Sequence, residues 1–243
     1  MKVLIACEES QRVCIAFRER GHEAYSCDIL ECSGGHPEWH IQGDVLPIIN
    51  GNCEFETADG QRHRIDGKWD LLIAHPPCTY MSKAGARWMY PTAGKIDKNR
   101  FEKAMKAKEF FLEFYNANCE HIAIENPVPL KCVGLPKYTQ KIQPYEFDVE
   151  NKHPYSKQTL LWLKNLPLLI KTTPDKAPKS TWMPSNTGSF SRGGGGGRGI
   201  AHDAKTASKT FSGIAKAMAE QWGDRMNDSI SRQAAIDALQ GRK

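Results

Sequence analysis

Short apolar runs alternate with amphipathic stretches through the first part of the chain. Lys2 to Cys7 (KVLIAC) and His22 to Asp28 (HEAYSCD) have the composition of buried strands. Between them, from about Gln11 to Arg20, apolar residues recur at helical spacing, and Ser10 is a suitable N-cap. A strand, a helix and a second strand in this order predict a βαβ unit with parallel strands and a right-handed crossover.

The same alternation continues further along the chain. Trp69 to Ala74 (WDLLIA) and His121 to Ile124 predict two more core strands, and Asp97 to about Asn118 predicts a long helix between them. The core face of that helix is expected to comprise Phe101, Met105, Lys108, Phe111 and Leu112, widened by Phe110 and Phe114. We therefore expect an α/β fold, Rossmann-like, with a mostly parallel sheet, flanking helices, and ligands at the carboxyl ends of the strands.

The remaining segments predict the domain organisation. Asp59-Gly60 between two short strand-like runs indicates a hairpin inserted at about residues 50–68. Thr159 to Leu163 is strand-like, whereas residues 171–210 are rich in Pro, Lys, Ser and Gly and include five consecutive glycines. We expect a catalytic core over residues 1–170, a flexible basic loop over 171–210, and C-terminal helices over 211–243, the first of which returns to the core.

Composition narrows the class of protein. A chain of 243 residues, 40% hydrophobic, can bury one good core. No run approaches the roughly 18 apolar residues that a membrane span requires, and the start MKVLIACEES reads as a strand rather than a signal peptide, which predicts a cytoplasmic protein. The net charge of +5 permits a polyanionic partner. The spacing of Cys27, Cys32, His36 and His40 does not match a structural zinc site, so we expect no metal.

Two of the predicted strands end in residues that can do chemistry. The run ending at Ala74 stops at His75-Pro76-Pro77 and presents Cys78 to solvent on a stiff loop, and the next core strand ends in Glu125-Asn126-Pro127. Because parallel neighbours end at the same edge of a sheet, a sulfur and a carboxyl group are expected over one site.

This pair suits covalent chemistry on cytosine. A thiolate that adds to position 6 of the ring makes position 5 nucleophilic, and thiolates both attack and leave readily. The addition places negative charge on the ring, which a glutamic acid with a raised pKa can neutralise at N3 while accepting from the exocyclic amine. Cys78 and Glu125 fit these two roles.

The segment PPCTYMSKAG, from Pro76 to Gly85, resembles the Pro-Cys nucleophile motif of the cytosine-C5 DNA methyltransferases, including the later Ser and Ala-Gly. Glu125-Asn126 resembles the family's Glu-Asn dipeptide, with Pro127 where Val is usual. Asp28 and Gly43-Asp44-Val45 fall where the family places its contacts to the ribose and adenine of S-adenosylmethionine. The resemblance covers roughly residues 1–130, and Gly213-Ile214-Ala215 is weakly similar to the final motif.

The resemblance implies a short, phage-like member of that family without a full target-recognition domain. It implies S-adenosylmethionine as cofactor, DNA as partner and methylation at C5 of cytosine. The residues implied are Cys78 and Glu125 for catalysis, Cys7, Glu8, Ser10, Asp28, Ile29, Asp44, Val45 and Pro76 for the cofactor, and Pro77, Ser82, Asn126 and Lys157 for the substrate.

The chain departs from the family pattern in three places. The first loop, Cys7 to Gln11, has no glycine, so Glu8 or Glu9 is expected to attract the ammonium or sulfonium group and the helix N-terminus to take the carboxylate. The Gln-x-Arg-x-Arg motif is absent, and Lys157 is its nearest counterpart. Only residues 171–210 stand in place of a recognition segment. Two alternatives therefore stay open: methylation of a free deoxycytidine nucleotide, and a catalytically silent DNA-binding homologue.

Overall fold

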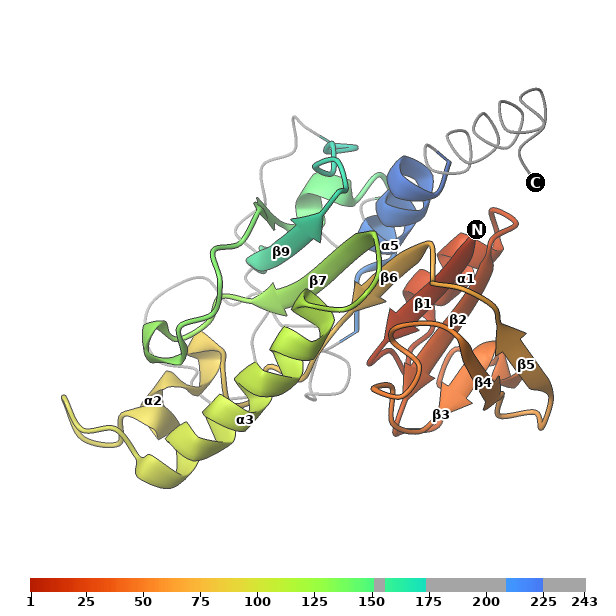
Figure 1. The fold of residues 1–243 in the computed structure, drawn as a ribbon. Helices are drawn as coiled ribbons and strands as arrows, with labels where there is room; N and C mark the ends of the chain where they lie inside the picture. The colour runs from red at the N-terminus through yellow and green to blue at the C-terminus, as the bar shows by residue number, and fades with distance from the viewer. Residues whose placement is uncertain (151–155, 174–208, 225–243) are drawn as a thin grey trace.

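A computed structural model of the protein describes residues 1–150, 156–173 and 209–224. Seven strands form one sheet in the order β3-β2-β1-β6-β7-β9-β8 (Figure 1). Only β9 runs against the others, because it pairs antiparallel with both β7 and β8. The strands are β1 (Lys2–Ala6), β2 (Glu23–Asp28), β3 (His40–Gln42), β6 (Leu71–Ala74), β7 (His121–Pro127), β8 (Gln140–Ile142) and β9 (Thr159–Lys164). The predicted Rossmann-like α/β fold is confirmed.

The centre of the sheet explains why its strands are apolar throughout. β1 and β6 pair in parallel, with Val3 opposite Leu71 and Ala6 opposite Ala74, and all four side chains are fully buried. Strands covered on both faces read as continuous apolar runs. The order of strands reverses between β1 and β6, which is the switch point where open α/β sheets bind ligands beyond their carboxyl ends.

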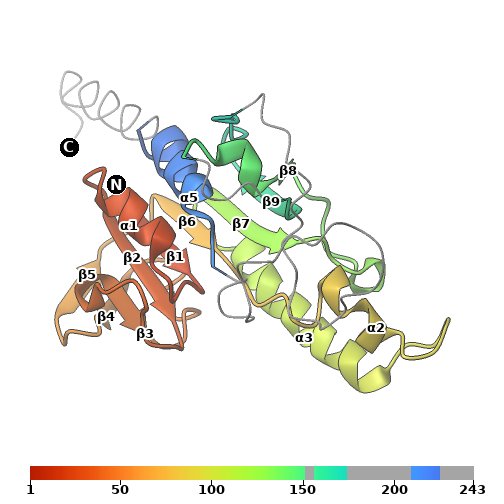
Figure 2. The same cartoon turned by 180° about the vertical axis from the view of Figure 1, so that it is seen from behind.

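Helices cover both faces of the sheet, as the two opposite views show (Figures 1 and 2). On one face α3 (Lys98–Tyr115) packs with alternate residues of the strands, such as Leu4 and Leu72. On the other face α1 (Arg12–Arg18) and α5 (Ser212–Met218) pack with the intervening residues, such as Ile5. Because successive side chains of a strand point to opposite faces of the sheet, each central strand contributes side chains to both hydrophobic cores.

The smaller elements lie around this frame. β4 (Cys53–Glu56) and β5 (Arg62–Ile65) form an antiparallel hairpin, and its Phe55 packs against Tyr25 and Trp69. The other short elements are α2 (Ala86–Met89), the 3₁₀ turns Pro37–Trp39, Lys83–Gly85, Lys131–Val133 and Pro144–Phe147, and the π-helical turn Ala219–Gly223 that extends α5. No helix in the described ranges is long and apolar enough to cross a membrane.

Two local expectations about helices are wrong. Ser10 does not cap α1, because the N-cap is Gln11, whose side chain makes no capping hydrogen bond. Lys108 does not lie in the core of α3 and is only half-buried, whereas Ala104, Phe111 and Phe114 are fully buried. Residues 174–208, with the five glycines, and 225–243, with a predicted tail helix, lie outside the described residues.

Candidate functional site

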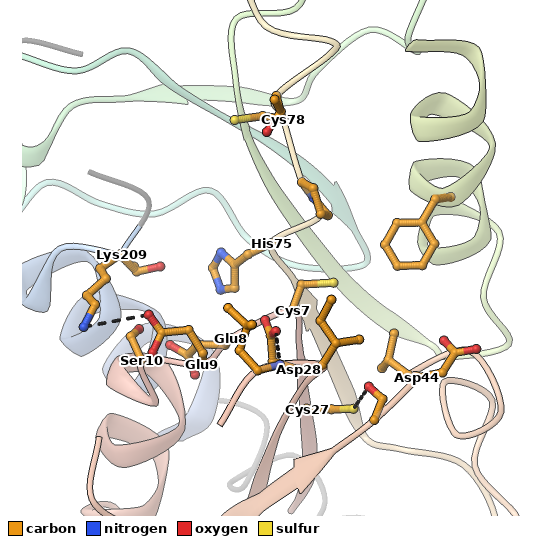
Figure 3. Close-up of a pocket in the computed structure, with 18 residues that line it drawn as sticks. Cys7, Glu8, Glu9, Ser10, Cys27, Asp28, Asp44, His75, Cys78 and Lys209 are labelled. Atoms are coloured by element: carbon orange, nitrogen blue, oxygen red, sulfur yellow. Dashed lines mark hydrogen bonds and ion pairs between the residues drawn. The ribbon is translucent and has the colours of Figure 1, made fainter. Parts of the chain in front are cut away.

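A pocket of about 550 Å³ lies at the carboxyl ends of β1, β2 and β6 (Figure 3). It includes every residue expected to bind the cofactor except Pro76, and it also includes Cys78. Its other lining residues are Glu9, Cys27, Leu30, Gly43, His75, Pro77, Thr79, Phe110, Lys209 and Thr210. Lys209 and Thr210 are separated from α5 only by its N-cap, Phe211, so the chain returns to this pocket just before that helix.

The first loop adopts backbone conformations that normally favour glycine. Cys7 has φ 59° and Gln11 has φ 56°, which for other residues costs on the order of 1–3 kcal/mol each. The Gln11 side chain helps to hold this loop: its Nε2 donates to the His36 carbonyl at 2.8 Å, and its Oε1 accepts from the His36 amide at 3.1 Å. A Cβ on Gly34 would lie 2.6 Å from Gln11 Cβ, so glycine is required there instead.

Glu8 has a structural role that the sequence pattern did not reveal. Its Oε1 accepts from the Val13 amide at 2.7 Å and its Oε2 accepts from the Cys14 amide at 3.1 Å, so the carboxyl group occupies the N-terminus of α1. Burial raises the pKa of Glu8, and His75 and the two amides oppose that rise. Two of the amides expected to bind the cofactor's carboxylate thus already have Glu8 as their acceptor, and binding of that carboxylate at this helix terminus stays a prediction.

Glu9 is the acidic side chain of this loop that remains available. Its carboxylate is buried, and neither oxygen has a hydrogen-bond partner among the described residues. Lys209 forms an ion pair with it, with Nζ 3.8 Å from Glu9 Oε1 (Figure 3). The same Nζ donates to Ser33 Oγ at 2.8 Å. A buried carboxylate beside an open pocket suits a positively charged ligand group.

The far side of the pocket combines carboxylates with apolar side chains. Asp28 Oδ1 accepts from the Leu30 amide at 3.0 Å, and Asp44 Oδ1 accepts from the Leu46 amide at 3.1 Å. Each carboxylate therefore stabilises the turn of the backbone that follows it. Ile29 is 75% exposed although its side chain is large and apolar. An apolar group that faces a pocket in this way is stabilised when a flat apolar ligand covers it.

The loop that carries Cys78 is held to the end of β7 and to the loop that follows it. Asn126 Nδ2 donates to the Pro76 carbonyl at 2.8 Å, the Leu130 amide donates to the Met81 carbonyl at 2.7 Å, and Ser82 forms an isolated β-bridge with Pro129. Asn126 is buried, and its Oδ1 has no hydrogen-bond partner within the described ranges. These contacts fix the position of the Cys78 loop relative to the end of β7 and the loop that follows it.

The Cys78 thiol is less open to solvent than the sequence suggested. The residue is half-buried, and burial together with the charge of Glu125 raises its pKa. Lys157 and a hydrogen bond with Ser82 act in the opposite direction without reversing the shift. The expectation of a thiol presented to solvent is wrong, and the raised pKa favours the neutral thiol.

Glu125 is paired with His75, a residue whose role the motif analysis missed. His75 Nδ1 lies 3.2 Å from Glu125 Oε2, and both side chains are largely buried. Burial would raise the pKa of Glu125, but His75, Lys157 and Thr159 together lower it, and the same ion pair raises the pKa of His75. The raised pKa expected for Glu125 is therefore wrong. The available signal was the position of His75, directly after a buried strand and before two prolines.

Lys157 is brought to the same centre from the segment before β9. It is half-buried, it influences the pKa values of Cys78, Glu125 and His75, and its Nζ lies 5.5 Å from the centre of the Phe211 ring.

His40, considered above as a metal ligand, instead forms hydrogen bonds with Ser26 and the Leu30 carbonyl. Among the described residues no group of three or more His, Cys, Asp or Glu side chains is arranged to hold a metal ion.

No protein-family model matches this chain. No curated protein matches it either. Among solved structures, one described as a DNA modification methyltransferase encoded within an E. coli prophage aligns with a TM-score of 0.36 and 12% identity, over 67% of this chain and 46% of that one. An rRNA methylase from Escherichia coli aligns with a TM-score of 0.31 and 16% identity, over 66% and 55%.

This chain thus spans about half the length of those two solved chains. Alignments at such low TM-scores carry no weight for function. The fold assignment rests on the order and direction of the strands in the sheet.

Proposed function

We propose that this protein is an S-adenosylmethionine-dependent methyltransferase that acts on C5 of cytosine in DNA through a covalent adduct with Cys78. The observation that carries the proposal is the placement of Cys78 and Glu125. Cys78 follows β6 and Glu125 lies near the end of β7, the adjacent parallel strand, and Cys78 lines a pocket that begins at the switch point of the sheet. A nucleophile, an acidic partner and a ligand pocket therefore share one edge of the sheet.

The pocket fits the proposed cofactor. Its volume of about 550 Å³ lies within the range of roughly 300–1,000 Å³ usual for small-molecule sites. The Glu9 carboxylate, which accepts no hydrogen bond among the described residues, suits the ammonium or sulfonium group, Asp28 suits the ribose hydroxyls, and Ile29 with Val45 suits the adenine ring. When bound, S-adenosylmethionine supplies an electrophilic methyl group.

The residues of the chain prepare the cytosine for that group. Cys78 loses its proton to water and forms a bond from Sγ to C6, and the ring electrons move toward N3 and C5. Glu125 stabilises N3 and accepts from the exocyclic amine, which selects cytosine. Lys157 favours the thiolate through its positive charge. After methylation at C5, a water-mediated base removes the C5 proton, the electrons re-form the ring double bond, and Cys78 leaves.

A basic surface next to Cys78 favours DNA over a free nucleotide. Between residues 83 and 106 the acidic residues are Asp97 and Glu102, whereas the basic residues are Lys83, Arg87, Lys95, Lys98, Arg100, Lys103 and Lys106. Trp88 is 53% exposed on the same segment. Figures 1 and 2 show α2 and the start of α3 projecting from the sheet. Cations interspersed with an exposed aromatic ring suit a phosphate backbone and its bases.

Covalent trapping tests this proposal. Duplex DNA that contains 5-fluorocytosine should form a stable complex with the protein in the presence of S-adenosylmethionine, because the fluorine blocks the final elimination. Cys78→Ser should abolish the complex, whereas Cys53→Ser, which changes a half-buried cysteine outside the pocket, should retain it. A complex that persists in Cys78→Ser would show that another thiol is the nucleophile.

The two alternatives give different results in the same series. If 5-fluorodeoxycytidine monophosphate is trapped and DNA is not, the substrate is the free nucleotide. If calorimetry detects no binding of S-adenosylmethionine or its demethylated product, the protein is the catalytically silent DNA-binding homologue. Arg87→Glu combined with Lys95→Glu should slow trapping on DNA and leave any trapping of the nucleotide unchanged.

A further inference from the structure

One buried polar atom at the pocket has no role in the steps above. The His75 side chain is only 9% exposed, its Nδ1 lies 3.2 Å from Glu125 Oε2, and its Nε2 has no hydrogen-bond partner within the described ranges. His75 lines the pocket, and in Figure 3 its ring points from the end of β6 toward the first loop. Because an unpaired buried nitrogen is costly, this atom is expected to face a ligand or a bound water.

Charged groups surround this histidine from three elements. Glu125 lies on β7, Glu8 on the loop after β1, and Lys157 on the segment before β9, and the charge of each influences the His75 pKa. The two carboxyl groups favour the charged imidazolium, and Lys157 opposes it. Among these three groups, the one that contacts the ring directly is Glu125.

The chemistry of Glu125 leaves a requirement unmet. Addition of sulfur to C6 builds negative charge that a proton at N3 would neutralise, yet the ion pair with His75 favours Glu125 as a carboxylate. A proton therefore has to reach Glu125 during the reaction. The hydrogen bond from His75 Nδ1 provides a path of a single step.

We propose that His75 is a positioning residue that stores the proton which Glu125 passes to N3 of cytosine. As the Sγ–C6 bond forms, the ring electrons move to N3, the proton on His75 Nδ1 moves to the Glu125 carboxyl group, and that group protonates N3. His75 becomes neutral and keeps its proton on Nε2, facing the pocket. When Cys78 leaves, the proton returns from N3 through Glu125 to Nδ1, so none is consumed.

This inference rests on the proposed function, and trapping on 5-fluorocytosine DNA measured between pH 5.5 and 9 tests both. The wild-type rate should contain a component that falls as pH rises through the pKa of His75. His75→Asn retains a hydrogen-bond donor to Glu125 but no transferable proton. It should lower the rate at saturating S-adenosylmethionine roughly 10-fold to 100-fold and remove that component. Measuring the rate at saturation separates this loss from any change in cofactor affinity.

A double variant shows whether His75 acts through Glu125. His75→Asn combined with Glu125→Gln should react no more slowly than Glu125→Gln alone, because the two residues belong to one path. Independent, multiplying losses would overturn the proposal. A loss in His75→Asn with an unchanged pH profile would also overturn it, since that is the result of a purely structural role.

A second measurement does not depend on the stability of His75 variants. The His75 ring titrated by NMR in the wild-type protein should show a pKa above 6.5, and Glu125→Gln should lower it. A His75 pKa that is unchanged by Glu125→Gln would overturn the proposal that His75 stores a proton for Glu125. Absence of any wild-type adduct at every pH would instead overturn the proposed function, and this inference with it.

Discussion

At the scale of single residues, the reactivity of Cys78 is set by neighbours that oppose each other. Burial and Glu125 raise the thiol pKa, whereas Lys157 and Ser82 lower it. A resting thiol of this kind is protected from adventitious oxidation and alkylation, because the thiolate is the reactive form. Glu125 and Lys157 are also proposed to act on cytosine. Their effect on the reactivity of the Cys78 thiol can be measured without any substrate.

Alkylation of Cys78 by iodoacetamide should respond in opposite directions to two substitutions. Glu125→Gln removes a negative charge, so it should lower the Cys78 pKa and speed alkylation at pH 8 by roughly 3-fold to 10-fold, equivalent to half to one pKa unit. Lys157→Met should slow alkylation. Peptide mass mapping at Cys78 gives the rate, and the exposed Glu113→Gln serves as the control. Slower alkylation in Glu125→Gln would contradict this account.

At the scale of elements, α1 begins in an unusual way. The N-cap residue makes no side-chain hydrogen bond to the helix, and the carboxyl group of Glu8 accepts from two amides of the first turn. The loop before it contains left-handed residues at Cys7 and Gln11. Glu8 thus couples the end of β1, the edge of the pocket and the start of α1.

Removal of this cap should be costly. Glu8→Ala leaves the amides of Val13 and Cys14 buried without acceptors, which should lower the free energy of unfolding by about 2 kcal/mol. Urea denaturation followed by circular dichroism measures the change. Glu19→Ala, at the exposed C-terminal end of the same helix, should change stability by less than about 0.5 kcal/mol. Equal stability of Glu8→Ala and wild type would refute the capping role.

At the scale of the whole molecule, the C-terminal helix completes one of the two cores. α5 contributes Ile214 and Met218 to the cluster that also holds Phe17 and Phe147. Gly213 makes this packing possible, because a Cβ there would lie 2.0 Å from the Phe147 carbonyl oxygen. The chain preceding α5 lines the pocket, so the seating of this helix also shapes the ligand site.

Gly213→Ala should therefore affect both stability and binding. The added methyl group forces α5 away from the turn that ends at Phe147, and the overpacking should cost about 1–3 kcal/mol. Thermal unfolding should show a lower Tm, and calorimetry should show weaker binding of S-adenosylmethionine. Ser212→Ala, at an exposed position of the same helix, is the matched control. An unchanged Tm in Gly213→Ala would contradict the close approach.

Sequence alone determined the elements and the order in which they follow one another. The apolar runs at β1, β2, β6 and β7 and the helical spacing of α3 are local patterns, and local backbone geometry translates them directly into strands and helices. The neighbouring positions of Cys78 and Glu125 followed from the same reasoning, because adjacent parallel strands end at one edge.

Only the tertiary structure decided how these groups are used. Glu8 is a helix cap, Glu9 is the available carboxylate, Cys78 is half-buried and Glu125 is paired with His75. The reversed direction of β9 was equally invisible in its apolar pattern. The physical reason is common to all of these. Burial, hydrogen-bond partners and pKa values depend on atoms that are close in space and distant along the chain, and periodicity carries no record of them.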